Sequence, residues 1–151
     1  MKAGQGVPWK VSILAQRLLH DRLPTKVNLV TRGILSWKAH YCVSGCGAVE
    51  SAQHLVPLLQ HFCFSLVTFV ALSAGGLRAR RSFMQLIWLV SVWVVWHERN
   101  SRLFRGSANS VQHMLDKIKA FSYRLMKATS STLALNYHCW WSCLLLCLSL
   151  V

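Results

Sequence analysis

Two cysteines and a histidine in the stretch CVSGCGAVESAQHL have the types and the spacing of a structural zinc site. Cys42 and Cys46 are separated by three residues, which include a Ser-Gly pair suited to a tight turn. We expect residues Glu50 to Gln53 to open a helix, and His54 would lie on this helix. Thiolate and imidazole groups are the ligands that Zn²⁺ takes in tetrahedral structural sites. The spacing therefore predicts a zinc knuckle.

The fourth ligand is left open between two residues. On the helical face of His54, the positions three, four and seven residues later hold Pro57, Leu58 and His61. Cys63 is a poorer angular match, but it reaches the site if the helix ends at Pro57. The predicted ligands are therefore Cys42, Cys46 and His54, with His61 or Cys63. The alternative is a set of free cysteines and ordinary core histidines.

Cysteine usage favours thiols or a metal site over disulfides. The six cysteines are at positions 42, 46, 63, 139, 143 and 147. The first ten residues lack the apolar region of a signal peptide, which predicts a reducing compartment.

The charge balance points to a polyanionic partner. The chain has 17 Lys and Arg against four acids, a formal net charge of +13. Such an excess favours the phosphates of RNA or DNA, or an anionic membrane surface. The candidate phosphate-binding residues, each with an ordinary solvated side chain as the alternative, are Lys10, Arg17, Arg22, Lys26, Arg32, Arg78, Arg80 and Arg81.

The four acids also argue against an enzyme. A polymerase or nuclease needs clustered carboxylates to hold two Mg²⁺ ions, and acids at positions 21, 50, 98 and 116 are scattered. Glu98 is next to His97, but adjacent helical positions point about 100° apart and do not form a catalytic dyad. We expect Glu98 to pair with Arg102, four residues on.

The pattern predicts a mostly α fold of about five helices, with the knuckle loop between the second and third. A basic amphipathic helix should end before Pro24, and a short second helix should run from an N-cap at Thr25 to a stop at Gly33. Residues 82–96 form an uncharged run. In a last helix over residues 110–128, capped by Ser110, one apolar stripe should contain Val111, Met114, Leu115, Ile118, Phe121 and Leu125. Lys117, Lys119, Arg124 and Lys127 should lie off that stripe.

A two-span membrane protein is an alternative. Residues 55–77 and 82–96 lack charges and flank the basic sequence RARR, which would form a cytosolic turn. The first run is interrupted by Pro57 and two glycines, and the second is 15 residues long, short of the roughly 20 needed for a span. We favour the other interpretation of such runs, a helix buried all round inside a soluble assembly.

Three stretches together resemble the zinc-binding domain found at the C-terminal end of plant non-LTR retrotransposon reverse-transcriptase polyproteins. The matching positions of the first stretch are Pro8, Lys10-Val11, Arg17-Leu18, Leu23-Pro24-Thr25, Asn28-Leu29 and Arg32-Gly33. Those of the knuckle are Cys42, Cys46, Glu50-Ser51 and His54-Leu55. The Trp-rich stretch over residues 86–104 ends, as in the family, in Glu98-Arg99-Asn100 and Phe104.

The resemblance implies a zinc-binding module with a nuclear or cytoplasmic location, whose partners are nucleic acid or the rest of a polymerase polyprotein. The family's fourth ligand is usually a Cys five residues after the His, and that position is Leu59. Zinc binding then depends on His61 or Cys63 as a substitute. We interpret the departure as the drift of a decayed fragment.

The sequence therefore predicts a non-catalytic, zinc-binding and nucleic-acid-associated module. It would comprise residues 1–106, with the knuckle at 42–63, followed by an amphipathic helix and an apolar tail over 107–151. The alternatives are the two-span membrane protein and a metal-free interaction fragment. The fragment is suggested by 54% hydrophobic content, because such apolar helices would need a partner.

Overall fold

The computed structural model describes residues 8–55 and 77–129 of the chain, with side chains described in the second range from residue 85 onward. Every regular element in these ranges is helical, and one isolated bridge between Tyr41 and Val49 supplies the extended structure there. The predicted mostly α fold is confirmed.

Two helices open the described chain. Helix α1 spans Trp9–Leu19 and buries Val11, Ala15 and Leu18, which lie one turn apart on one face. Helix α2 spans Lys26–Thr31, and the Thr25 side chain caps it by accepting a hydrogen bond from the Asn28 amide at 3.3 Å. The chain leaves α2 through Gly33, whose φ of 71° is left-handed. Both predicted ends of the second helix are confirmed.

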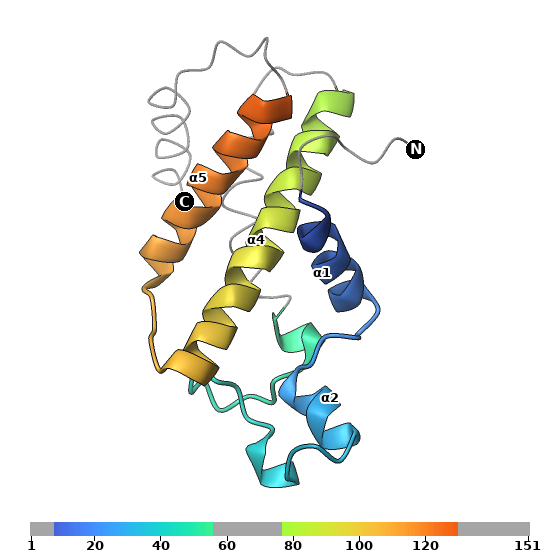
Figure 1. The fold of residues 1–151 in the computed structure, drawn as a ribbon, viewed down its shortest axis with the longest axis vertical. Coiled ribbons are helices and arrows are strands. Elements are labelled where there is room, and N and C mark those ends of the chain that lie inside the picture. The colour runs from blue at the N-terminus through green and yellow to red at the C-terminus, as the bar shows by residue number, and fades with distance from the viewer. Residues whose placement is uncertain (1–7, 56–76, 130–151) are drawn as a thin grey trace.

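The knuckle lies between α2 and a third helical segment, as predicted. A short 3-10 helix, η1, spans Trp37–Ala39 and leads into the Tyr41–Val49 bridge. Residues 52–55 are helical and carry His54. In Figure 1, α2 and the knuckle form the lower end of the molecule.

Helix α4 spans Leu77–Arg105 and is the central element, because it packs against α1 and α5 (Figure 1). Its described buried residues point in several directions around the axis, from Leu86 and Ile87 to Val94 and Val95. This matches the interpretation of an apolar helix buried inside a protein.

The predicted basic turn is wrong. The backbone of residues 78–81 is helical and forms the start of α4. Leu, Arg and Ala are strong helix formers, so the LRARR sequence continues directly into the apolar run.

Within residues 8–55 and 77–129, no helix has the length and apolarity that crossing a membrane requires. The run 82–96 belongs to the longer helix α4, which carries on into charged residues. Most of the other candidate span, residues 56–76, lies outside the described residues.

Helix α5 spans Val111–Thr129 and lies alongside α4. Ser110 caps it as predicted, by accepting a hydrogen bond from the His113 amide at 3.2 Å. The predicted stripe is partly wrong, because Val111 and Phe121 are exposed whereas Lys119 and Ser122 are fully buried. Residues 118, 119 and 122 share one face of the helix. Packing has turned this face inward, so the buried face is rotated relative to the predicted stripe.

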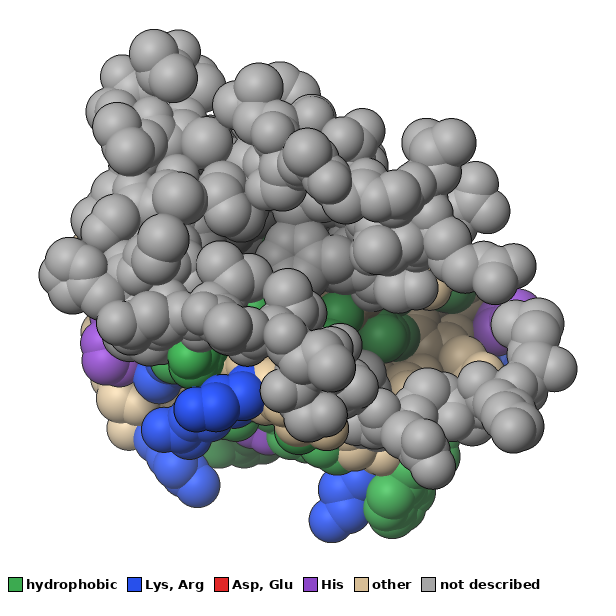
Figure 2. All heavy atoms as spheres, turned by 90° about the horizontal axis from the view of Figure 1, so that it is seen from above, with side chains coloured by type: hydrophobic (Ala, Val, Ile, Leu, Met, Phe, Trp, Pro, Cys, Tyr) green, Lys and Arg blue, Asp and Glu red, His purple; other side chains and the backbone are tan. Residues whose placement is uncertain are grey.

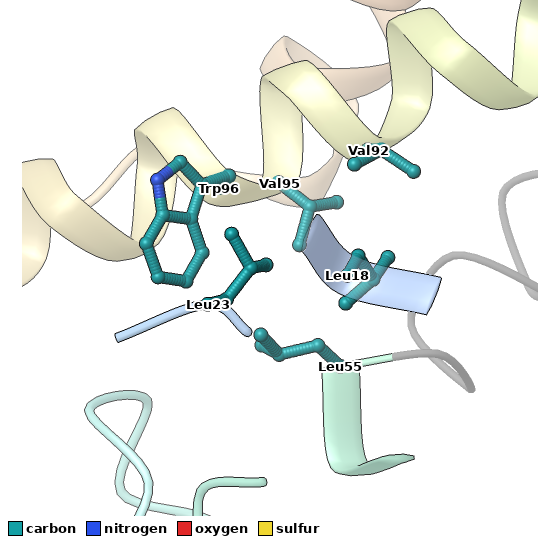
Figure 3. Close-up of a pocket in the computed structure, with 6 residues that line it drawn as sticks. All are labelled: Leu18, Leu23, Leu55, Val92, Val95 and Trp96. Carbon is teal, nitrogen blue, oxygen red and sulfur yellow. The ribbon is translucent and has the colours of Figure 1, made fainter. Parts of the chain in front are cut away.

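One hydrophobic core joins these elements. Figure 3 shows its part beside the knuckle, where Leu18 from α1, Leu23 from the α1–α2 connection and Leu55 meet Val92, Val95 and Trp96 of α4. Leu55 directly follows His54, so this core anchors the helical segment that carries the third predicted ligand.

Candidate metal centre

The structure brings the three described candidate ligands together. The Sγ atoms of Cys42 and Cys46 and a ring nitrogen of His54 all lie within 4.8 Å of one another. Cys46 Sγ and His54 Nε2 lie 3.3 Å apart. Cys42 is buried, Cys46 is exposed and His54 is half-buried, so the site opens to solvent on one side. Both cysteines are free thiols.

A tight hairpin presents the two cysteines. The Cys42 amide donates to the Ala48 carbonyl at 2.8 Å, and the Gly45 amide donates to the Cys42 carbonyl at 3.1 Å. Gly45 and Gly47 have φ values of 73° and 77°, which glycine adopts without the steric cost of a Cβ. These turns bring Cys46 back toward Cys42.

The Cys42 sulfur is also held by the backbone. The Ser44 amide lies 3.4 Å from Cys42 Sγ and donates toward it. Hydrogen bonds to a ligand atom from its surroundings fix the orientation of that ligand in metal sites. The hairpin thus positions the first ligand.

His54 is positioned by a helix cap. The Ser51 hydroxyl accepts a hydrogen bond from the His54 amide at 3.0 Å, which is the geometry of an N-cap at the start of a helix. With Leu55 packed in the core, the imidazole is fixed beside Cys46 rather than free on the surface.

Beneath the hairpin, the Glu50 carboxylate binds three parts of the chain. Its side chain is fully buried. Oε1 accepts from the Lys26 amide at the start of α2 at 3.1 Å, and Oε2 accepts from the Val43 amide of the knuckle at 3.4 Å. The carboxylate also pairs with Arg99 of α4, whose Nη2 lies 2.5 Å from Oε1.

Arg99 completes this network from the side of α4. Its Nε donates to Glu50 at 3.0 Å, Nη2 also reaches the Pro24 carbonyl at 3.3 Å, and the guanidinium lies 4.9 Å from the centre of the Trp96 ring. Arg99 is buried, and a buried charge is tolerated when it is paired and hydrogen-bonded in this way. The Glu50–Arg99 pair therefore joins the knuckle, α2 and α4.

The donor set fits zinc. Zn–S and Zn–N bonds of about 2.3 and 2.0 Å in a tetrahedron place two sulfurs about 3.8 Å apart and a sulfur and a nitrogen about 3.5 Å apart. The 3.3 Å approach and the 4.8 Å limit bracket these spacings, so small side-chain movements would suffice. The predicted fourth ligands His61 and Cys63, and Leu59 at the usual ligand position, lie outside the described residues.

The candidate phosphate-binding residues are spread out rather than gathered. Lys10, Arg17, Arg22 and Arg32 are exposed on or beside α1 and α2. Lys26 is half-buried, and its Nζ donates to the Tyr41 carbonyl at 2.8 Å. Residues 78–81, whose side chains are not described, lie at the upper end of α4 in Figure 1, opposite α2.

The described acids offset few of these basic side chains at the surface. Glu50 and Glu98, two of the four acids, are buried in ion pairs with arginines of α4. On the face drawn in Figure 2, lysine and arginine side chains lie beside hydrophobic ones, and no acidic side chain is visible among the described residues. Most of the described lysine and arginine side chains therefore lie outside the core.

Glu98 has the structural role predicted for it. Arg102 Nε donates to its carboxylate at 2.9 Å, which confirms the expected pair, and the Asn109 amide and side chain donate at 2.7 and 2.6 Å. Burial raises the pKa of Glu98, but the two Asn109 hydrogen bonds and Arg102 outweigh it, so the pKa falls below its ordinary value. Glu98 thus fastens the α4–α5 connection.

Reasoning from the residues alone missed the pair between Glu50 and Arg99. Glu50 was expected only to open a helix, and Arg99 had no role beyond the resemblance. The available signal was their place in the Glu-Ser and Glu-Arg-Asn motifs, although no spacing rule connects residues 49 positions apart.

Comparisons with protein-family models, curated proteins and solved structures find no match to this chain. The resemblance to the reverse-transcriptase zinc-binding domain stays a prediction carried by the motifs.

Proposed function

We propose that this chain is a non-catalytic zinc-binding module that associates with nucleic acid, and that it derives from the C-terminal region of a retrotransposon reverse transcriptase. The observation that carries the proposal is the convergence of Cys42, Cys46 and His54, whose ligand atoms lie within 4.8 Å. When bound, the metal would supply structural crosslinking, since thiolate–imidazole sites of this kind hold loops together.

The arrangement of the motifs supports the relationship. Arg99 of the Glu-Arg-Asn motif binds Glu50 of the Glu-Ser motif and the carbonyl of Pro24 in the Leu-Pro-Thr motif. Residues that carry the resemblance in three separate stretches thus form one buried network under the knuckle. A chance similarity of short motifs would give no reason for these residues to meet.

The charge distribution supports nucleic acid as the partner. Half of the acids are neutralised inside the fold, while Lys10, Arg17, Arg22 and Arg32 face solvent. Binding by phosphate contacts releases counterions, so its affinity falls steeply with salt. The decayed ligand position at Leu59 makes weakened metal binding part of the proposal.

Metal analysis of the purified chain tests the knuckle. We expect about one zinc per chain, lost in the Cys42→Ser, Cys46→Ser double variant and retained in Cys139→Ser, a cysteine outside the predicted ligands. Separate His61→Ala and Cys63→Ser variants identify the fourth ligand by which one loses the metal. A chain without zinc, or a double variant that keeps it, would favour the metal-free interaction fragment.

A salt titration tests the phosphate contacts. The logarithm of the RNA affinity should fall linearly with the logarithm of salt concentration, and each phosphate-binding residue changed to alanine should reduce the slope by roughly 0.7–0.9. Arg17→Ala and Arg32→Ala are suitable, because both side chains are exposed and their loss leaves the core intact. An affinity that does not respond to salt would reject phosphate binding.

A further inference from the structure

Two large aromatic side chains beside the knuckle are exposed to solvent. Trp37, at the start of η1, is 66% exposed, and Tyr41, which precedes the first ligand, is 51% exposed. Burying such rings is strongly favourable, so their exposure at one short loop indicates a surface that meets a partner.

The loop that carries these rings is held in place. The His40 ring donates from Nδ1 to the Trp37 carbonyl and stacks against Tyr41 with centroids 4.4 Å apart. Tyr41 also forms the bridge to Val49, and its carbonyl accepts the hydrogen bond from Lys26. Because the backbone of this loop is held before binding, the loop would lose little conformational entropy when a partner binds.

Two cationic side chains lie on this loop and on the neighbouring helix. Lys38 Nζ lies 5.7 Å from the centre of the Trp37 ring, and Arg32 is exposed at the end of α2, which contacts η1. The acid nearest in sequence, Glu50, is buried and neutralised by Arg99. A partner that offers both flat rings and negative charge is complementary to this surface.

We propose that Trp37 and Tyr41 form a stacking platform for the bases of a single-stranded nucleic acid, with Lys38 and Arg32 beside its phosphates. The inference deepens the proposed function, on which it rests, by specifying the strand type. In a duplex the base faces are hidden in the helical stack, whereas in a single strand they are available to aromatic side chains. A platform of exposed rings with flanking cations is the arrangement that sequence-tolerant single-strand binders use.

The test measures fluorescence anisotropy of the full chain with a labelled single-stranded RNA of about 20 nucleotides, and with a duplex of equal phosphate number. Trp37→Ala and Tyr41→Ala should each weaken single-strand binding by about 5- to 150-fold, while Tyr41→Phe retains it, because stacking needs the ring and not the hydroxyl. Duplex affinity and the salt slope should change little.

Trp9→Ala is the matched control. Trp9 is 68% exposed and has Lys10 Nζ 5.7 Å from its ring centre, but it opens α1, away from η1 in Figure 1. It should leave single-strand binding unchanged, and far-UV circular dichroism should show the same helix content in all variants.

The outcomes separate this inference from the proposed function. If the wild-type chain binds neither RNA, the proposed function fails and the platform falls with it. If the chain binds RNA in a salt-dependent way but Trp37→Ala and Tyr41→Ala bind as tightly as wild type, the platform is refuted while the phosphate contacts stand. An equal loss of single-strand binding in Trp9→Ala would also refute the platform. So would RNA binding that is unaltered in the Trp37 and Tyr41 variants because these rings contact a protein instead.

Discussion

Replacing Glu50 with glutamine tests whether the buried pair with Arg99 holds the knuckle to the rest of the fold. The substitution keeps the size of the side chain and removes its charge. Arg99, only 6% exposed, would then keep its bonds to Asn100 and Pro24 but lose its counter-charge. Removing one partner of a buried ion pair is costly, because the remaining charge is left uncompensated in a poorly solvated place.

The expected loss is about 3–5 kcal/mol of unfolding free energy, the range for breaking a buried pair by removing one partner. The geometry places Glu50 in this range, because its side chain is fully buried and contacts Arg99 through both Nε and Nη2. For a chain of this size, about 1 kcal/mol corresponds to about 2–4 °C, so the unfolding temperature should fall by about 6–20 °C.

The assay is thermal unfolding followed by circular dichroism, together with zinc affinity from competition with a chelator. Glu50→Gln should lower the zinc affinity as well as stability, because Oε2 holds the amide of Val43, the residue after Cys42. Glu98→Gln is the matched control: it breaks the other buried pair of α4 and should destabilise the chain without changing the affinity of the metal.

A second variant distinguishes the effect of an unpaired buried charge from a general loss of packing. The double variant Glu50→Met, Arg99→Met removes both charges, and replacing a buried pair by apolar groups is often close to neutral. It should therefore be more stable than Glu50→Gln. A Glu50→Gln chain within about 1 kcal/mol of wild type, or a double variant as unstable as the single one, would refute the reasoning.

Four further outcomes follow from the structure. The pKa of Glu98 is lowered in the folded chain, so the ionised carboxylate contributes stability above the unfolded pKa, and this stability is lost as pH falls through the folded pKa. The unfolding temperature of Glu98→Gln should therefore fall less steeply than that of wild type from about pH 6 to pH 3. Burial lowers the pKa of Lys119, although Asp116 raises it, so the folded chain binds this proton less tightly than the unfolded chain. Lys119→Met should then be more stable than wild type at neutral pH, with a difference that shrinks as pH approaches 10.5 in chemical-denaturation curves. Thr25→Ala should lose about 1 kcal/mol in the same denaturation experiment, because it removes the cap of α2. Gly47→Ala should lose about 1–2 kcal/mol and weaken zinc binding, since a Cβ is disfavoured at its φ of 77° although no neighbouring atom obstructs it.

Local signals in the sequence predicted the elements whose structure depends on neighbouring residues. The cap at Thr25, the stop at Gly33, the cap at Ser110 and the Glu98–Arg102 pair are all set within a few positions of the chain, and each is confirmed. The meeting of the cysteine pair with His54 was also predictable, because a tight turn and the start of a helix bring them close.

Features set by tertiary packing were predicted less well. The apolar stripe of α5 was defined by residue type, but the face that packs inward is shifted toward Lys119 and Ser122, and Phe121 is exposed. Likewise, the basic sequence at residues 78–81 was interpreted as a turn because it separates two apolar runs, although its helix propensity is high. Polarity alone does not identify an end of a helix.

The Glu50–Arg99 network joins the candidate metal centre to the rest of the fold. Here the Cys42–Gly47 turn is closed by backbone hydrogen bonds, His54 is capped by Ser51, and Glu50 ties the loop to α2 and α4, all through protein groups. These contacts already bring the three ligand atoms within 4.8 Å. A bound zinc ion would add a crosslink between the same loop and helical segment that these contacts join. The proposed aromatic platform is likewise held by protein groups, through His40 and the bridge to Val49.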